Sequence, residues 1–315
     1  MSKVFFSLSL ITALGLLSSC TYQEVPACEI ELIVLGAGQD AGAPQLGNSN
    51  DDGPQLFPSS LALIDRNGGK RYLFDATPAI TEQLALLDEL EPSKDGLDLD
   101  GIFLTHAHIG HYFGLAYLGR EAASSRNIPV FVMPRMGEFL RNNGPWDQLL
   151  DLKNIELINL DNDGNGFNIE LSSDLFVSAF TVPHRDEYSE TVGFRISTKE
   201  SSAIYLPDID SLSDWENNTG VSLADRIGET DYFFLDATFW SDNELGSRDM
   251  SKIPHPRVLA TMDLLQDLPV EQREKILFIH YNHTNPLRHP TSSETQLVKK
   301  RGFGIARRRH TVCLG

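Results

Sequence analysis

The sequence predicts an α/β protein, on the basis of three observations. Short apolar runs that fit β-strands recur along the whole chain, and fewer amphipathic segments that fit helices lie between them. No short-period repeat interrupts this mixed order. The chain has 315 residues, of which 41% are hydrophobic, enough for a sizeable core in one large domain or in two closely packed halves.

Individual elements follow from the pattern of apolar residues. Ile30, Leu32 and Val34 recur at every second position, as in a strand. Thr77 and Pro78 are typical of an N-cap and a first helical turn. We expect strands over 29–35, 60–65, 71–75, 101–104, 130–133, 155–160, 168–171, 176–182, 192–197, 203–206, 232–235 and 275–279. We expect helices after Pro78, from Tyr112 to Arg120, near Leu212 and Leu223, and over 256–266. Among the strands between residues 130 and 197 we expect only one helix, around 137–142.

Three of the nine histidines lie within six residues, in the stretch Thr105-His106-Ala107-His108-Ile109-Gly110-His111. They follow an apolar strand end, so they would lie on the turn before a helix, where two rings lean toward one point and His111 approaches from the side. Neutral imidazole is the commonest protein metal ligand, and zinc binds such nitrogens at about 2.0–2.1 Å in a tetrahedral arrangement. Histidines can gather by chance as surface or core residues, but this spacing after a strand favours a metal site.

The N-terminus has the features of an export signal. Lys3 precedes an apolar run from Val4 to Leu17, which is short for a transmembrane helix but has the proportions of a signal peptide. Leu17-Ser18-Ser19-Cys20 resembles a bacterial lipobox, which implies cleavage after residue 19 and lipid attachment to Cys20; a simple secretory signal is the alternative. We therefore expect a signal peptide at 1–19, a lipid-anchored tether at 20–28 and one domain at 29–315. Thr21, rather than aspartate, after the cysteine indicates the outer membrane in a Gram-negative host, with the protein on the periplasmic side of the cell envelope.

Charge and cysteine content narrow the function further. With 26 basic and 44 acidic residues the chain carries a formal net charge of −18, so it would repel phosphate backbones, and we expect no nucleic-acid partner. Basic clusters at 299–301 and 307–309 fit a solvated face, or alternatively a lip that attracts an anionic substrate. Gly36, Gly38 and Gly42 do not have the spacing of a dinucleotide-binding loop.

In an exported chain Cys28 and Cys313 would form a disulfide between the first and last strands, provided that their Cα atoms lie close enough.

Residues 105–115 resemble the histidine motif of the metallo-β-lactamase superfamily, whose usual form is Thr-His-x-His-x-Asp-His. Further segments, in order along the chain, resemble the branch that contains coenzyme PQQ synthesis protein B: 34–45, 75–78, 118–122, 235–240 and 279–286. The resemblance covers nearly all of the chain after residue 30. It implies a four-layer αββα sandwich, in which two mixed sheets are flanked by helices and the site lies at one edge of the sheets.

The resemblance also implies a set of metal ligands. Histidines at strand ends, His106, His108 and His184, match the first metal site, and Asp208 matches the aspartate that bridges two metals. His111 and His280 match the second site, and His283 could replace or support His280. The implied cofactor is zinc, one or two ions, with iron or manganese as alternatives. Asp208 and His111 are the implied catalytic residues, whereas His255, His289 and His310 are expected to be structural or exposed.

Two departures from the family pattern affect this expectation. Gly110 stands where the motif has aspartate, so the second metal site would have one ligand fewer. Three other carboxylates could replace that aspartate or orient a ligand: Asp40, Asp186 and Asp236. The branch usually has a cysteine cluster for a structural zinc after its Pro-Gln pair, but here residues 46–50 contain no cysteine. The quinone-cofactor protein has also lost most of the superfamily's histidine ligands, which this chain keeps, and it acts in the cytoplasm.

The function expected from these features is an exported, metal-dependent hydrolase. Zinc would lower the pKa of a bound water to near 7 and polarise an ester, phosphodiester or lactone-type substrate, including a β-lactam. A small, anionic molecule is the expected substrate. We expect the protein to be attached to the membrane through the N-terminal lipid. Two alternatives stay open: a non-catalytic protein that binds a small ligand such as a quinone cofactor, and an iron-dependent oxidation related to the synthesis of that cofactor.

Overall fold

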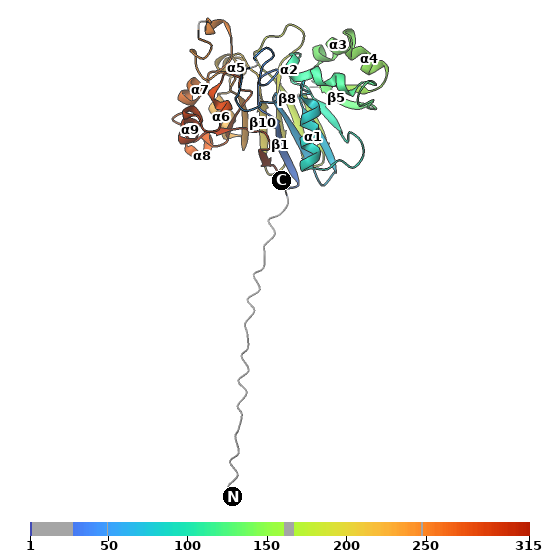
Figure 1. The fold of residues 1–315 in the computed structure, drawn as a ribbon, viewed down its shortest axis with the longest axis horizontal. Coiled ribbons are helices and arrows are strands. Elements are labelled where there is room, and N and C mark those ends of the chain that lie inside the picture. The colour runs from blue at the N-terminus through green and yellow to red at the C-terminus, as the bar shows by residue number, and fades with distance from the viewer. Residues whose placement is uncertain (2–27, 49, 161–166, 247) are drawn as a thin grey trace.

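The computed structural model describes residue 1 and residues 28–48, 50–160, 167–246 and 248–315. The expected signal peptide and Cys20 lie outside the described residues. Two sheets of seven strands each pack face to face, and helices cover their outer faces (Figure 1). This arrangement confirms the predicted αββα sandwich. Within the described part of the chain, no helix combines the length and the apolar character needed to cross a bilayer.

The first sheet has the strand order β14-β1-β2-β3-β4-β5-β6. The strands at the β1 edge are antiparallel, and those from β3 to β6 are parallel. The carboxyl ends of the parallel strands therefore meet at one edge of the sheet. The bounds are β1 Ile30–Gly36, β2 Ser60–Asp65, β3 Lys70–Phe74, β4 Gly101–Phe103, β5 Ile128–Val132, β6 Ile155–Asn159 and β14 Thr311–Cys313.

The second sheet mirrors this plan, with the order β13-β12-β11-β10-β9-β8-β7. Its strands β10 to β13 are parallel, and β7 to β9 form antiparallel pairs. The bounds are β7 Phe167–Ser172, β8 Leu175–Thr181, β9 Val192–Ser197, β10 Ser202–Leu206, β11 Tyr232–Asp236, β12 Ile276–Ile279 and β13 Gly304–Ile305.

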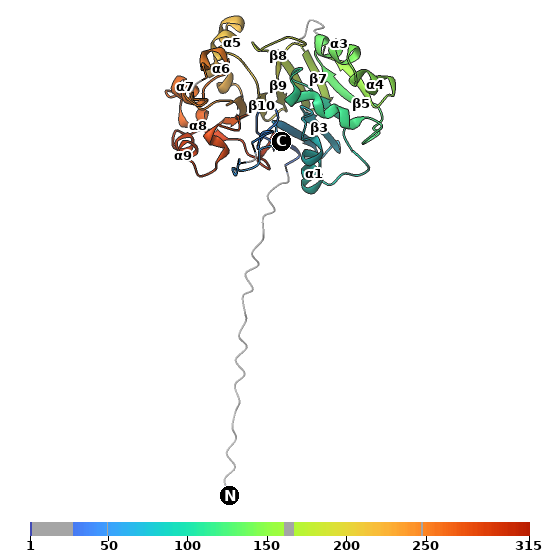
Figure 2. The ribbon, with the colours of Figure 1, turned by 45° about the horizontal axis from the view of Figure 1, so that its top comes forward.

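Helices gather on the two outer sides of the sandwich, and Figure 2 shows α1, α3 and α4 on one side and α5 to α9 on the other. The first side has α1 Ile80–Leu90, α2 Ile109–Tyr112, the 3₁₀ helix η1 Phe113–Leu118, α3 Pro134–Asn142 and α4 Trp146–Asp151. The second has α5 Leu212–Thr219, α6 Leu223–Gly228, α7 Val258–Leu264, α8 Val270–Arg273 and α9 Ser293–Lys300, with the short 3₁₀ helices η2 Met250–Lys252 and η3 Pro286–Arg288 nearby in the sequence.

Aromatic rings join the two sheets in the core. Phe74 and Phe103 of the first sheet stack at 5.0 Å, and both contact Phe194 of the second sheet, at 5.4 and 5.6 Å between ring centroids. The neighbouring residues of these strands face the other way and pack under the helices, as Leu73 and Ile102 do. Each central strand is thus buried on both faces, which explains its nearly continuous apolar sequence.

Several element boundaries differ from the sequence expectation. The helix after Pro78 begins at Ile80 with Ala79 as N-cap, because the Thr77 hydroxyl is engaged in a local turn with the Ala79 N–H and in a hydrogen bond to Gln83. The helix expected from Tyr112 begins instead at Ile109, so His111 lies within it. The expectation of a single helix between residues 130 and 197 is wrong, because α3 and α4 both lie there.

The disulfide expected from the sequence is confirmed. Cys28 and Cys313 are bonded, with their Cα atoms 5.7 Å apart, and their bond joins the chain just before β1 to the neighbouring strand β14. It lies at the opposite end of β1 from the loop that reaches the functional site described below.

Removing this disulfide tests its contribution to stability. The Cys28→Ser, Cys313→Ser double variant should lose about 2–4 kcal/mol of unfolding free energy, because the bond restricts an unfolded loop of 285 residues. Urea unfolding of both proteins measures the difference. An unchanged midpoint would contradict a stabilising role.

Candidate metal centre

The polar residues of the site follow the carboxyl ends of strands from both sheets. Asp75 follows β3, His106 and His108 follow β4, and Asp208 follows β10. The remaining members come from the ends of β8, β11 and β12 and are His184, Asp236 and His280. Both sheets end their parallel strands at this edge, so the fold itself brings residues distant in sequence together.

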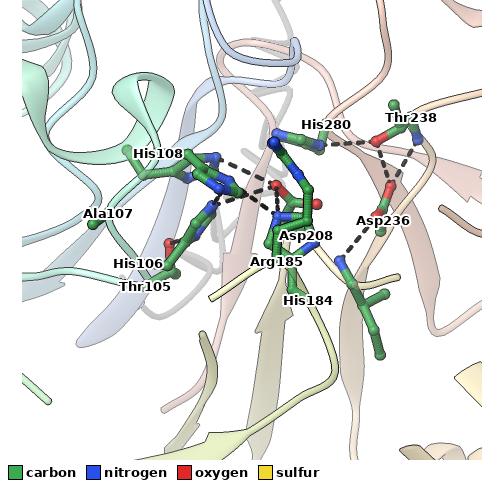
Figure 3. Close-up of polar contacts among 12 residues, drawn as sticks. Thr105, His106, Ala107, His108, His184, Arg185, Asp208, Asp236, Thr238 and His280 are labelled. Carbon is green, nitrogen blue, oxygen red and sulfur yellow. Dashed lines mark hydrogen bonds and ion pairs between the residues drawn. The ribbon is translucent and has the colours of Figure 1, made fainter. Parts of the chain in front are cut away.

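His106, His108, His184 and Asp208 converge in a first group (Figure 3). His108 Nδ1 lies 2.8 Å from His106 Nε2 and 3.0 Å from His184 Nε2. Asp208 Oδ2 lies 3.2 Å from His184 Nε2 and 3.5 Å from His106 Nε2. Four ligand atoms therefore surround one point.

The buried carboxylate of Asp75 fixes two of the rings on the first sheet. Its Oδ1 accepts the backbone N–H and the hydroxyl of Thr105, both at 2.9 Å, and the Thr105 oxygen accepts Nδ1–H of His106 at 3.0 Å. Its Oδ2 accepts Nδ1–H of His111 at 2.8 Å. These partners assign the proton of each neutral ring to Nδ1, so Nε2 carries a lone pair that is free to bind a metal.

Asp236 repeats this arrangement on the second sheet (Figure 3). Its Oδ1 accepts the N–H and the hydroxyl of Thr238, at 2.8 and 2.7 Å, and the Thr238 oxygen accepts Nδ1–H of His280 at 3.0 Å. Its Oδ2 accepts Nδ1–H of His255 at 3.0 Å. His280 is thereby held in the same tautomer as His106, with a bare Nε2.

The other two rings of the first group are fixed by carboxylates as well. His184 donates its Nδ1–H to Asp210 Oδ1 at 2.6 Å and turns Nε2 toward the group. His108 has the reverse orientation, because it donates Nε2–H to Glu187 at 3.3 Å and turns Nδ1 inward. In its neutral form, each of the three rings thus presents a nitrogen with a free lone pair to the same point.

The first group fits a tetrahedral metal ion. Bonds of about 2.0–2.1 Å to zinc separate neighbouring ligand atoms by about 3.3 Å in a regular tetrahedron. The four nitrogen–nitrogen and nitrogen–oxygen separations given above run from 2.8 to 3.5 Å. Where these atoms carry lone pairs, they repel one another unless a proton or a metal ion lies between them. The donor set and its spacing therefore match a metal site.

Asp40, His111 and His280 form a second group, whose ligand atoms all lie within 4.8 Å of one another. Asp208 Oδ2 is 3.9 Å from His111 Nε2, so this carboxylate borders both groups. Both histidines are buried, and none of the described residues provides a hydrogen-bond partner for their Nε2 atoms. Buried polar atoms are rarely left without partners, so these two indicate a bound ion.

Electrostatics favour a cation at this place. Burial lowers the pKa of His106 and of His280 well below the usual range, so both rings are neutral. Burial also acts to lower the pKa of His184, but the carboxylates of Asp208 and Asp210 outweigh it and raise that pKa to about 10. Burial would raise the pKa of Asp208, yet the charges of His184 and His255 hold it well below its usual range. The carboxylates thus stabilise positive charge, which a metal ion supplies.

His255 belongs to the site, and the expectation that it lies outside is wrong. Its Nδ1 is 3.0 Å from Asp236 Oδ2 and 3.3 Å from Asp208 Oδ1. No pattern in the sequence indicates this role, because His255 lies on a loop that follows no strand directly. Asp236, expected as a candidate carboxylate, serves here to orient His255 and His280.

Two candidate residues lie outside both groups of possible ligands. His283 is hydrogen-bonded to the neighbouring Asn282 side chain at 2.8 Å, and Asp186 is exposed and pairs with Arg135 at 3.2 Å. Residues that the sequence reasoning missed are those that hold the rings: Asp75, Thr105, Asp210 and Thr238. Their shared signal is a polar residue within a few positions of a buried strand end.

Alanine at His106 or His108 should remove the first metal ion, because each substitution deletes one of four ligands. We expect affinity to fall by more than about 100-fold, since loss of a residue that merely orients a ligand already costs about 10- to 100-fold. Equilibrium dialysis with elemental analysis measures the metal content, and His289→Ala, at an exposed histidine, is the matched control. Full metal content in either site variant would contradict the assignment.

Comparison with known proteins agrees with this fold. Coenzyme PQQ synthesis protein B of Rhizobium meliloti is 26% identical over 306 residues, covering 88% of this chain and 95% of that protein. Zn(2+)-bound PqqB from Methylobacterium extorquens superposes with a TM-score of 0.70 at 21% identity, over 90% of this chain and 99% of that one. A diphosphatase from the PhnP family gives a TM-score of 0.62 at 21% identity, over 90% and 96% of the two chains.

A family model covers the region that builds the site. It describes the beta-lactamase superfamily domain and matches residues 70–281, from the first residue of β3 to just past His280. The match includes His106, His108, His184 and Asp208. The chain therefore belongs to the metallo-β-lactamase superfamily.

Proposed function

We propose that this chain is an exported, lipid-anchored hydrolase that uses zinc to cleave a small anionic ester, phosphodiester or lactone-type substrate. The observation that carries the proposal is the set of five inward-facing ring nitrogens, whose rings are each fixed on the outer side by a hydrogen bond to a carboxylate or to a threonine that a carboxylate holds. Such a set is assembled to bind metal. When bound, zinc supplies Lewis acidity: it lowers the pKa of a water and polarises the substrate's oxygen.

Asp208 is the residue that links the two groups of ligands. Its Oδ2 borders His106, His184 and His111, and its Oδ1 lies beside His255. Because its pKa is held low, Asp208 stays ionised and presents acceptor oxygens to both sides of the site. It would orient the attacking water and balance the positive charge of the site.

His255 is placed to give a proton to the leaving group. Two carboxylates, Asp236 and Asp208, border its Nδ1, so Nε2 is left for the substrate. Burial lowers the pKa of His255, but these carboxylates outweigh it and leave the pKa raised, which favours the charged form of the ring. This assigns the proton transfer to His255.

The surroundings of the first group favour a small anionic substrate. Arg185 directly follows His184, lies beside the cluster (Figure 3) and has a largely exposed side chain. Its Nη1 is 3.4 Å from Glu187, which in turn contacts His108. An exposed guanidinium next to the ligands can pair with a carboxylate or phosphate group of the substrate.

Export is supported by two features at the N-terminal end. The sequence before Cys20 has the order of a lipoprotein signal, and Cys28 is bonded to Cys313. Disulfides persist in oxidising compartments and are rare in the cytosol. We therefore place the protein on the periplasmic side of the cell envelope, anchored through the lipid on Cys20 in the outer membrane.

A second candidate function rests on the curated relatives. The similarity to coenzyme PQQ synthesis protein B extends over 88% of the chain, which favours a protein that binds a quinone cofactor or acts in its synthesis, including by an iron-dependent oxidation. Against it stands the complete set of histidine ligands together with the export signal.

Turnover should depend on the metal. Protein purified without added metal is assayed with bis-nitrophenyl phosphate and a chromogenic lactone, then treated with a chelator and resupplied with zinc. We expect activity to fall to background and to return, because zinc supplies the Lewis acid. Activity that survives complete metal removal would contradict the proposal. Inert, metal-loaded protein that binds the quinone cofactor saturably would support the second candidate instead.

Removal of His255 should have an effect that depends on the leaving group. His255→Ala is expected to lower kcat by about 10²- to 10⁴-fold for an alkyl ester, whose leaving group needs a proton, but much less for a nitrophenyl ester. Elemental analysis of the variant must show unchanged metal content. Equal losses for both substrates would show that His255 only positions Asp208.

A further inference from the structure

Gly110 is the position where the family motif has a metal-binding aspartate, and here the structure leaves no room for any side chain. A Cβ atom at Gly110 would lie 2.6 Å from Asp40 Cα and 2.9 Å from Asp40 Oδ1. Such distances are far inside van der Waals contact, and one of the two atoms is backbone. The glycine therefore permits close approach of the loop that carries Asp40.

The chain holds Asp40 between the segments that carry His111 and His280. On one side Gly110, the residue before His111, contacts Asp40 directly. On the other side, the Gln39 N–H donates to the carbonyl of Tyr281, the residue after His280, at 3.1 Å. The Asp40 backbone has φ of 39°, a left-handed conformation that aspartate and asparagine tolerate better than most residues. The loop thus presents the Asp40 carboxylate to these two rings.

The two rings lack partners where Asp40 approaches them. Nε2 of His111 and Nε2 of His280 are buried, and among the residues that the structure describes neither has a hydrogen-bond partner. An Asp40 oxygen and a nitrogen of each ring lie within 4.8 Å of one another, a spacing that leaves space for an ion between them. Two imidazoles and a carboxylate, with Asp208 at the border, form a donor set suited to zinc or another first-row divalent metal.

We infer that Asp40 is the carboxylate ligand of a second metal ion, bound with His111, His280 and Asp208. It would supply, from the loop after β1, the negative charge that Gly110 cannot supply from the histidine motif. The second site then does not have fewer ligands, contrary to the expectation from the sequence, because its carboxylate comes from elsewhere in the chain. The inference deepens the proposed function and rests on it for the first metal.

Asp40→Asn tests the inference with little change in shape. Asparagine keeps the size and the backbone tolerance of aspartate but removes the charge. Zinc binding is measured by native mass spectrometry and by titration against a competing chelator. We expect two zinc ions per wild-type chain, and in Asp40→Asn a second ion bound at least tenfold more weakly while the first is unchanged. Asp186→Asn, at an exposed carboxylate outside the site, is the matched control and should keep both ions.

Gly110→Ala gives an independent check. Its methyl group should push the Asp40 loop away and weaken the second ion as Asp40→Asn does. Circular dichroism and thermal unfolding show whether each variant is folded. Two equally tight ions in Asp40→Asn would overturn the inference, and so would a wild-type chain that binds only one.

Failure of this inference can be told apart from failure of the proposed function. A protein that hydrolyses no substrate but loses its second ion in Asp40→Asn keeps the inference and loses the function. A protein with chelator-sensitive turnover and one ion per chain, unaffected by Asp40→Asn, keeps the function and loses the inference.

Discussion

Two buried carboxylates, Asp75 and Asp236, constrain the whole site. Each ends or follows a strand in one of the two sheets, and each accepts a backbone N–H, a threonine hydroxyl and a ring N–H. A buried charge is costly unless it is hydrogen-bonded in this way, so the partners cannot turn freely. The same bonds that satisfy the carboxylates set the orientation and tautomer of the rings. The scaffold thereby fixes the rings of the candidate ligands through hydrogen bonds on their outer sides.

This rigidity carries a cost that a bound ion would relieve. Unprotonated nitrogens of His106 and His108 lie 2.8 Å apart, and nitrogens of His111 and His280 are buried without partners among the described residues. Such contacts destabilise the protein on their own. An ion that binds the folded state only would offset them and raise stability as well as provide chemistry. The metal-free protein is thus less stable than it could be, because its ligands are already held in the positions that bind metal.

The sequence predicted those parts of the structure that have a local signal. Apolar strands and the spacing of His106, His108 and His111 pointed to the sandwich and to the metal edge. Asp40, on the loop after β1, and Gly110, in helix α2, are far apart in sequence, so no local pattern could predict their contact. His255 lacked a strand end, and the short helix α4 begins with Trp146 after Pro145, without an N-cap hydrogen bond to mark its start.

We propose that this chain's own residues build two adjacent metal sites. Anomalous diffraction from crystals grown with zinc, recorded on both sides of the zinc absorption edge, would locate the ions. We expect two peaks, one bounded by His106, His108 and His184 and one by His111, His280 and Asp40. Peaks that lie elsewhere, or no peaks at all, would contradict this proposal.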